Sequence, residues 1–150
     1  MNIKIRPGLL FDIETIANFQ EKMAFETENM RLDSLTVEKG VTAVFDDPSR
    51  GKYWLAEIDG EVVGCLLTIN EWSDWRNGTV LWIHSVYVEE RHRQRGVYKK
   101  LYGHLKEMVE KSSELRGLRL YVDKTNTKAQ GVYEKLGMSA EHYHLYEWMK

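Results

Sequence analysis

Cysteine and long apolar runs are scarce in this sequence. Cys65 is the only cysteine, which excludes an intrachain disulfide framework and fits a reducing compartment. No stretch approaches the roughly 20 apolar residues of a membrane-spanning helix. The N-terminal residues 1–7 also lack the apolar segment of a secretory signal. We therefore expect a cytoplasmic protein without a membrane partner.

Neither sign of charge dominates the sequence. The formal net charge is −2, which argues against bulk electrostatic attraction to nucleic acid. Internal repeats, low-complexity tracts and linker-like segments are missing too, and no histidine–cysteine spacing indicates a metal site. The chain has 150 residues, of which 43% are hydrophobic and 29% charged. We expect one globular domain over residues 1–150.

The most informative stretch runs from Val80 to Lys111. Residues 80–88 are rich in β-branched and aromatic side chains, as in a largely buried strand, and residues 97–108 repeat apolar side chains at helical spacing. The loop between them has four arginine or histidine residues at positions 91–95, followed by Gly96. First-turn amides and the helix dipole attract an anion there by roughly 0.3–1 kcal/mol. The pattern favours a phosphate-bearing ligand.

Periodicity and turn residues predict the other elements. Helices are expected after Asp12, after Ser34 or Thr36, and after Asn126, because each of these side chains can cap a helix. Asp59-Gly60 predicts a hairpin turn. The expected strands are residues 2–6, 53–58, 61–69, 80–88, 118–122 and 140–149. The fold class is α+β: a mixed, mostly antiparallel sheet of six to seven strands with about four helices.

Two motifs of this sequence resemble those of the GNAT superfamily of N-acetyltransferases. Its pyrophosphate loop, Arg/Gln-x-x-Gly-x-Gly/Ala, corresponds to Arg93-Gln94-Arg95-Gly96-Val97-Tyr98, where Tyr98 replaces the usual small residue. Its downstream signature, Asn-x-x-Ala-x-x-x-Tyr-x-x-x-Gly-Phe, is in register with Asn126, Ala129, Tyr133 and Gly137, and Met138 replaces phenylalanine. The central segment looks most like the diamine and polyamine acetyltransferases and their thialysine-acetylating relatives.

The resemblance implies an enzyme that moves the acetyl group of acetyl-CoA to a primary amine by direct attack, without a metal. Backbone groups of Val86, Tyr87 and Val88 would bind the pantetheine arm, and one amide would polarise the thioester. Asn126 and Ala129 would also contact the cofactor. The pyrophosphate would be held, chiefly by main-chain amides, at Arg93, Gln94, Arg95, Gly96, Val97, Tyr98 and Lys99. The alternative for this loop is a solvated basic turn.

Tyr133 is the candidate general acid, because a phenol stays protonated at neutral pH and can donate to the leaving thiolate. The alternative is a core aromatic, and both readings can hold. His84 is the candidate base, and strand periodicity predicts that it shares a face with Val86. A satisfied structural histidine is the alternative. His142 and His144 are weaker candidates for the base.

The acceptor is expected to be a small polycationic or lysine-like amine. Glu26, Glu28 and Asp33 lie near the end of the first predicted helix, and Glu71, Trp72, Asp74 and Trp75 in the loop before residue 80. Carboxylates and indoles suit a cation through charge pairing and cation–π contact. Alternatively, the charges are solvated surface and the tryptophans form a homodimer contact.

A different class of function is also compatible with this fold. A catalytically silent acyl-CoA-binding domain would serve as a sensor or interaction module. Retention of both Asn126 and Tyr133 argues against it.

Overall fold

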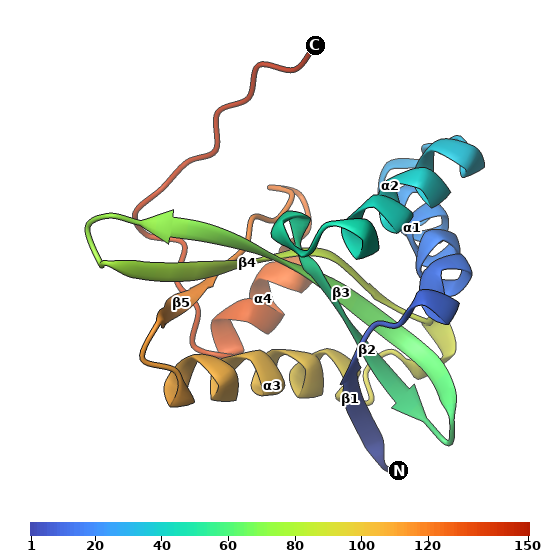
Figure 1. The fold of residues 1–150 in the computed structure, drawn as a ribbon, viewed down its shortest axis with the longest axis horizontal. Helices are drawn as coiled ribbons and strands as arrows, with labels where there is room; N and C mark the ends of the chain where they lie inside the picture. Colours follow the sequence, from blue (N-terminus) through green and yellow to red (C-terminus); the bar gives the residue numbers. More distant parts are fainter. The chain divides into compact units, whose positions relative to one another are not determined.

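The computed structural model describes residues 1–150 as two compact units, residues 1–119 and residues 120–150 (Figure 1). The first unit contains one sheet, whose strands in spatial order are β1 (Ile3–Pro7), β2 (Lys52–Ile58), β3 (Glu61–Ser73), β4 (Gly78–Val88) and β5 (Leu115–Arg119). The pairs from β1 to β4 are antiparallel, and β4 pairs with β5 in parallel. The mixed, mostly antiparallel sheet is confirmed. It has five strands, however, and not six to seven.

Helices cover both faces of this sheet (Figure 1). Helices α1 (Ile13–Glu28) and α2 (Ser34–Asp46) lie on one face and α3 (Val97–Lys111) on the other. Alternation along β2 explains the two layers: Leu55 packs in a cluster with residues of α1, whereas the Trp54 ring lies 4.8 Å from the ring of His104 in α3. Three single turns of 3-10 helix, Leu10–Asp12, Pro48–Arg50 and Glu90–His92, complete the unit. None of the helices is long and apolar enough to cross a membrane.

Of the three α-helices in the first unit, only α2 has a side-chain cap, and the residue is Asp33 and not Ser34 or Thr36. Asp33 caps α2, because its carboxylate accepts a hydrogen bond from the Thr36 amide at 2.9 Å. Asp12 stands at the cap position of α1, but its side chain makes no capping bond. It accepts instead from Arg6 at 2.8 Å and from the Leu9 amide at 2.7 Å. The predicted capping by Asp12 is wrong because a guanidinium and an earlier amide take both carboxylate oxygens.

The second unit contains the helix α4 (Thr127–Lys135), which brings the helix total to the expected four. Asn126 caps it as predicted, since its Oδ1 accepts from the Ala129 amide at 3.1 Å. Gly137 follows in the left-handed region with φ of 90°. The prediction of a strand at 140–149 is wrong, because these residues form no strand. A segment with strand propensity becomes a strand only when a neighbouring strand forms backbone hydrogen bonds with it.

The β3–β4 hairpin is longer than the sequence pattern predicted. Its register continues to the pairs Trp72–Thr79 and Ser73–Gly78. Glu71 and Trp72 therefore lie in β3 and not in a loop, and only the turn residues, which include Trp75, match that expectation. The polar residues beyond Ile69 hid the strand, because strand pairing at this end of the hairpin is made by the backbone and does not need an apolar side-chain pattern. The strand expected at 118–122 is also displaced, to Leu115–Arg119.

Candidate active site at the end of strand β4

A bulge at Ser85 and Val86 interrupts β4 near its end. His84 pairs with Leu67 and Tyr87 with Cys65, so two residues of β4 oppose one of β3. Ser85 has a φ of 52°, a left-handed conformation that bends the strand at this insertion. His84 therefore shares a face with Tyr87, and the prediction that it shares a face with Val86 is wrong. Strand periodicity fails here because the bulge shifts the alternation by one residue.

The last part of β4 has an open side. Its pairing with β5 covers only Thr79 to Trp82, so residues 83–88 have no strand partner on that side of the sheet. Val86, Tyr87 and Val88, the residues expected to bind the pantetheine arm, all lie in this segment. Backbone amides and carbonyls left without a ladder partner can bind an extended amide-bearing ligand as an added strand does. This geometry agrees with the expected use of the segment.

The loop that follows leads into α3 with a backbone suited to anions. Gln94 and Gly96 have left-handed φ values of 61° and 82°. Gly96 occupies the cap position of α3 and makes no side-chain capping bond, so the first-turn amides of the helix are not capped. His92 in the same loop has a buried Nδ1 without a hydrogen-bond partner. The uncapped amides at the start of α3 are thus left for a ligand, and an anion is the kind of group that such amides bind.

Helix α1 contacts this loop through two ion pairs that no sequence motif indicated. Lys22 Nζ donates to Glu89 at 3.1 Å, and Arg93 Nη2 donates to Glu26 at 2.5 Å. The Tyr87 hydroxyl also donates to Glu26, at 3.3 Å, and Arg93 Nε donates to the Val88 carbonyl at 2.8 Å. Burial and the nearby charge of Glu26 raise the pKa of Tyr87 to about 12. The only signal in the sequence is the spacing: Lys22 and Glu26 are four residues apart, and so are Glu89 and Arg93.

The two candidate catalytic side chains have shifted pKa values. Burial lowers the pKa of His84 below its usual 6.5, so the imidazole is neutral at pH 7 and can accept a proton. Tyr133 lies in α4 of the second unit, and burial raises the pKa of its phenol, which keeps the proton in place. His142 and His144 lie in the terminal segment without regular structure. Both shifts suit the acid and base roles expected of these residues.

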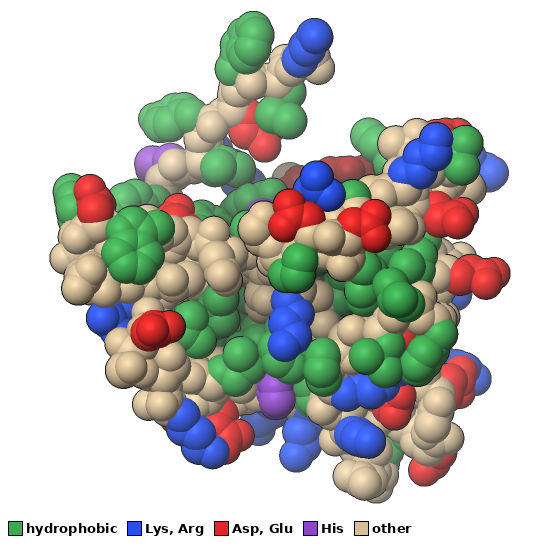
Figure 2. Space-filling view, in the orientation of Figure 1, with side chains coloured by type: hydrophobic (Ala, Val, Ile, Leu, Met, Phe, Trp, Pro, Cys, Tyr) green, Lys and Arg blue, Asp and Glu red, His purple; other side chains and the backbone are tan.

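Most of the carboxylates assigned to the acceptor already have partners within the chain. Glu26 pairs with Arg93, Glu71 accepts from Arg119 at 2.8 Å, and Asp33 caps α2. Glu28 is exposed and forms no ion pair. Trp72 and Trp75 are 63% and 88% exposed. Figure 2 shows acidic and basic side chains interspersed over the visible face.

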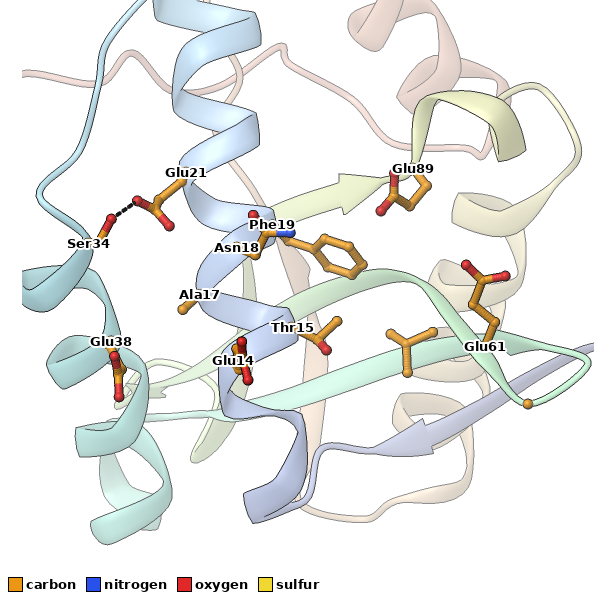
Figure 3. A pocket seen from close by; sticks show the side chains of 12 residues that line it. Glu14, Thr15, Ala17, Asn18, Phe19, Glu21, Ser34, Glu38, Glu61 and Glu89 are labelled. Carbon is orange, nitrogen blue, oxygen red and sulfur yellow. Dashed lines mark hydrogen bonds between the residues drawn. The ribbon is translucent and has the colours of Figure 1, made fainter.

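A pocket of about 650 Å³ lies between α1, α2 and the turn that joins β2 to β3, and Glu89 at the start of the β4–α3 loop also lines it (Figure 3). Its acidic lining is Glu14, Glu21, Glu38, Glu61 and Glu89. Several of these carboxylates are bound: Ser34 donates to Glu21, Arg91 to Glu61 and Lys22 to Glu89. Neither His84 nor Tyr133, the two candidate catalytic residues, lines this pocket.

The fold and the open strand next to an uncapped helix start define an acetyltransferase architecture. Residues 11–138 match the Acetyltransferase (GNAT) family. A solved protein described as a possible acetyltransferase from Clostridium difficile 630 is 39% identical, with a TM-score of 0.93 over 100% of this chain and 99% of that chain. The chain therefore belongs to the GNAT family of acetyltransferases and is an acyltransferase. Enzymes of this family use acetyl-CoA.

More distant structures share the fold. The ribosomal-protein-alanine N-acetyltransferase from Brucella melitensis biovar Abortus 2308 is 19% identical, with a TM-score of 0.80 over 99% of this chain and 100% of that one. AAC(6')-Iy, solved with the bisubstrate analog CoA-S-monomethyl-acetylneamine, is 16% identical, with a TM-score of 0.79 over 100% of this chain and 99% of that chain. No curated protein matches the sequence.

Proposed function

We propose that this protein transfers the acetyl group of acetyl-CoA to a primary amine by direct attack. The observation that carries the proposal is the unpaired side of β4 beside the uncapped start of α3. The first would bind the pantetheine arm through Val86, Tyr87 and Val88. The second would bind the pyrophosphate through main-chain amides of the loop and of the first turn of α3, from Arg93 to Lys99.

The reaction needs two proton transfers. The amine nitrogen attacks the thioester carbonyl, the C–S bond breaks, and the sulfur leaves as a thiolate. His84 takes the proton from the amine, directly or through water, and Tyr133 gives one to the sulfur. The lowered pKa of His84 and the raised pKa of Tyr133 support these roles. A backbone amide of β4 stabilises the oxyanion.

Direct attack is favoured over an acyl-enzyme on cysteine. Cys65 is the only cysteine, and its side chain is completely buried among core residues. Burial raises the pKa of its thiol to about 12, so the nucleophilic thiolate is rare at neutral pH. An acetyl group on this sulfur would also have no space in a packed core. The amine is therefore the first acceptor of the acetyl group.

The acceptor class that we propose is a small polycation or a lysine-like amine. Its support is local: the unpaired carboxylate of Glu28 at the end of α1 and the exposed indoles of Trp72 and Trp75. A homodimer contact is the other use of these indoles. A Trp75→Ala variant separates the two, because loss of a dimer changes the elution volume whereas loss of a cation contact raises the KM of the amine.

An amine panel tests the proposed function. The purified protein is incubated with acetyl-CoA and spermidine, a lysine analogue, a lysine-bearing peptide or a neutral arylamine, and free thiol is followed. We expect turnover with the cationic amines. Preference for the arylamine would overturn the acceptor class alone. Binding of acetyl-CoA without turnover on any amine would overturn the enzymatic proposal in favour of an acyl-CoA sensor.

A further inference from the structure

The loop between β4 and α3 is held from outside at two points. Lys22 and Glu26 stand four residues apart on α1, which places them on one face of the helix. Their partners, Glu89 and Arg93, are also four residues apart, one on each side of the 3-10 turn Glu90–His92. The charges alternate, so each pair is attractive in this register only. A shift of the loop along α1 would bring like charges together.

The guanidinium of Arg93 is bound by groups of the protein itself. Its Nη2 is bound to Glu26 and its Nε to the Val88 carbonyl, and its guanidinium carbon lies 5.4 Å from the centre of the Tyr87 ring. The bond to Val88 ties the far end of the loop to the end of the strand. A guanidinium with a carboxylate at 2.5 Å also has little net charge to offer a second anion.

Two other cations, one in the loop and one in the first turn of α3, remain available for phosphate. Arg95 and Lys99 are exposed and form no ion pair. They flank Gly96, whose left-handed φ of 82° sets up the start of α3. Binding of an anion by main-chain amides depends on a fixed backbone, since the amides must converge before the ligand arrives. The region therefore separates into a held segment in the loop, residues 89–93, and a segment that remains available to the ligand, residues 95–99, which includes the first turn of α3.

We infer that Arg93 is a brace of the pyrophosphate loop and not a phosphate ligand, and that Glu26 and Lys22 of α1 are positioning residues for acetyl-CoA. This inference rests on the proposed function, and it changes two assignments made from the sequence. Glu26 acts on the cofactor side and not on the acceptor, and Arg95 and Lys99 supply the positive charge toward the pyrophosphate. Helix α1 thereby sets the affinity for CoA without touching it.

The test compares two ligands by calorimetry in Glu26→Gln and in a control. CoA carries the pyrophosphate, whereas pantetheine has the same arm without it. We expect the Kd of CoA to rise about fivefold in Glu26→Gln and the Kd of pantetheine to change less than twofold. Glu14→Gln, on the same helix and with the same change of charge, should leave both values as in the wild type.

A double-variant cycle makes the test specific to the brace. If Glu26 acts through Arg93, the CoA effect of Glu26→Gln should disappear in an Arg93→Gln background. Exchanging the other pair, as Lys22→Glu with Glu89→Lys, should recover affinity lost in Lys22→Glu alone. Tighter CoA binding in Glu26→Gln, additive effects in the cycle, or equal losses for both ligands would overturn the inference. A wild-type protein that binds no CoA would instead overturn the proposed function, and the brace with it.

Discussion

The side chains of His84 and Tyr87 project from the same face of the sheet, although they are three residues apart in β4. Regular alternation would place them on opposite faces, and the bulge at Ser85 restores the match. Tyr87 packs in the core cluster with Cys65 and Phe19 of α1. A base at His84 therefore acts on the α1 side of the sheet.

His84→Gln should lower kcat about a hundredfold, because the amide keeps polarity but cannot take up a proton. In the wild type, activity should fall as pH drops through a pKa below 6.5, where the imidazole becomes charged. Stability should fall in the same range, because the unfolded chain binds that proton more readily. The pH profile of kcat checks this, with His104→Gln in α3 as the control that keeps the acidic limb. An unchanged limb in His84→Gln would remove it from the mechanism.

Tyr133→Phe should lower kcat about a hundredfold and leave the Kd of acetyl-CoA within twofold, since only the hydroxyl is lost. The raised pKa of Tyr133 keeps it protonated, so loss of this acid should not reduce wild-type kcat below about pH 10. Steady-state kinetics and calorimetry measure the two quantities. Tyr146→Phe, at a residue 91% exposed in the same unit, is the matched control. Wild-type kcat in Tyr133→Phe would exclude the acid role.

Gly96→Val should weaken CoA binding about tenfold through the backbone. An added Cβ meets no atom within 4 Å, so crowding is not the cause. The φ of 82° disfavours any side chain by roughly 1–2 kcal/mol and a β-branched one most of all. Gly103→Ala is the control: Gly103 is helical with open space around it, so the variant should raise stability by about 0.5–1 kcal/mol without changing the Kd. Equal CoA affinity in Gly96→Val and wild type would contradict the pyrophosphate assignment.

Local chemistry explains which parts of this structure the sequence could predict. The cap at Asn126 and the hairpin turn at Asp59-Gly60 depend on neighbouring backbone groups, and both are confirmed. The strand expected at 140–149 failed because a strand also needs a partner. The sheet is therefore smaller than the pattern predicted.

The site was predictable in its motifs and not in its long-range pairs. The left-handed conformation at Gly96 follows from the loop pattern. The Arg93–Glu26 pair joins residues 67 apart, and Glu26 is one of many glutamates in the sequence. Nothing local distinguishes a carboxylate that braces a loop from one that faces a substrate. The sequence did not predict the bulge at Ser85 either, because serine is not a residue that favours positive φ.

Glu28→Gln should raise the KM for a diamine more than for a monoamine of equal length, because the second ammonium loses its partner. For the wild type, kcat/KM with the diamine should fall as salt rises, since ions screen exposed charges over about 10 Å at 0.1 M. Initial rates over a salt series give both values. Glu110→Gln, an exposed carboxylate on α3, controls for net charge. Equal KM changes for both amines would exclude Glu28 from acceptor binding.

Acetyl transfer to the amine is tested most directly with acetyl-CoA labelled with ¹³C in the acetyl group. The protein, the labelled donor and spermidine are incubated, and mass spectrometry follows the amine while free CoA is quantified. We predict a labelled N-acetyl amine that forms in equal amount with free CoA. Free CoA without labelled amide would show thioester hydrolysis, and neither product with any amine of the panel would contradict the enzymatic account.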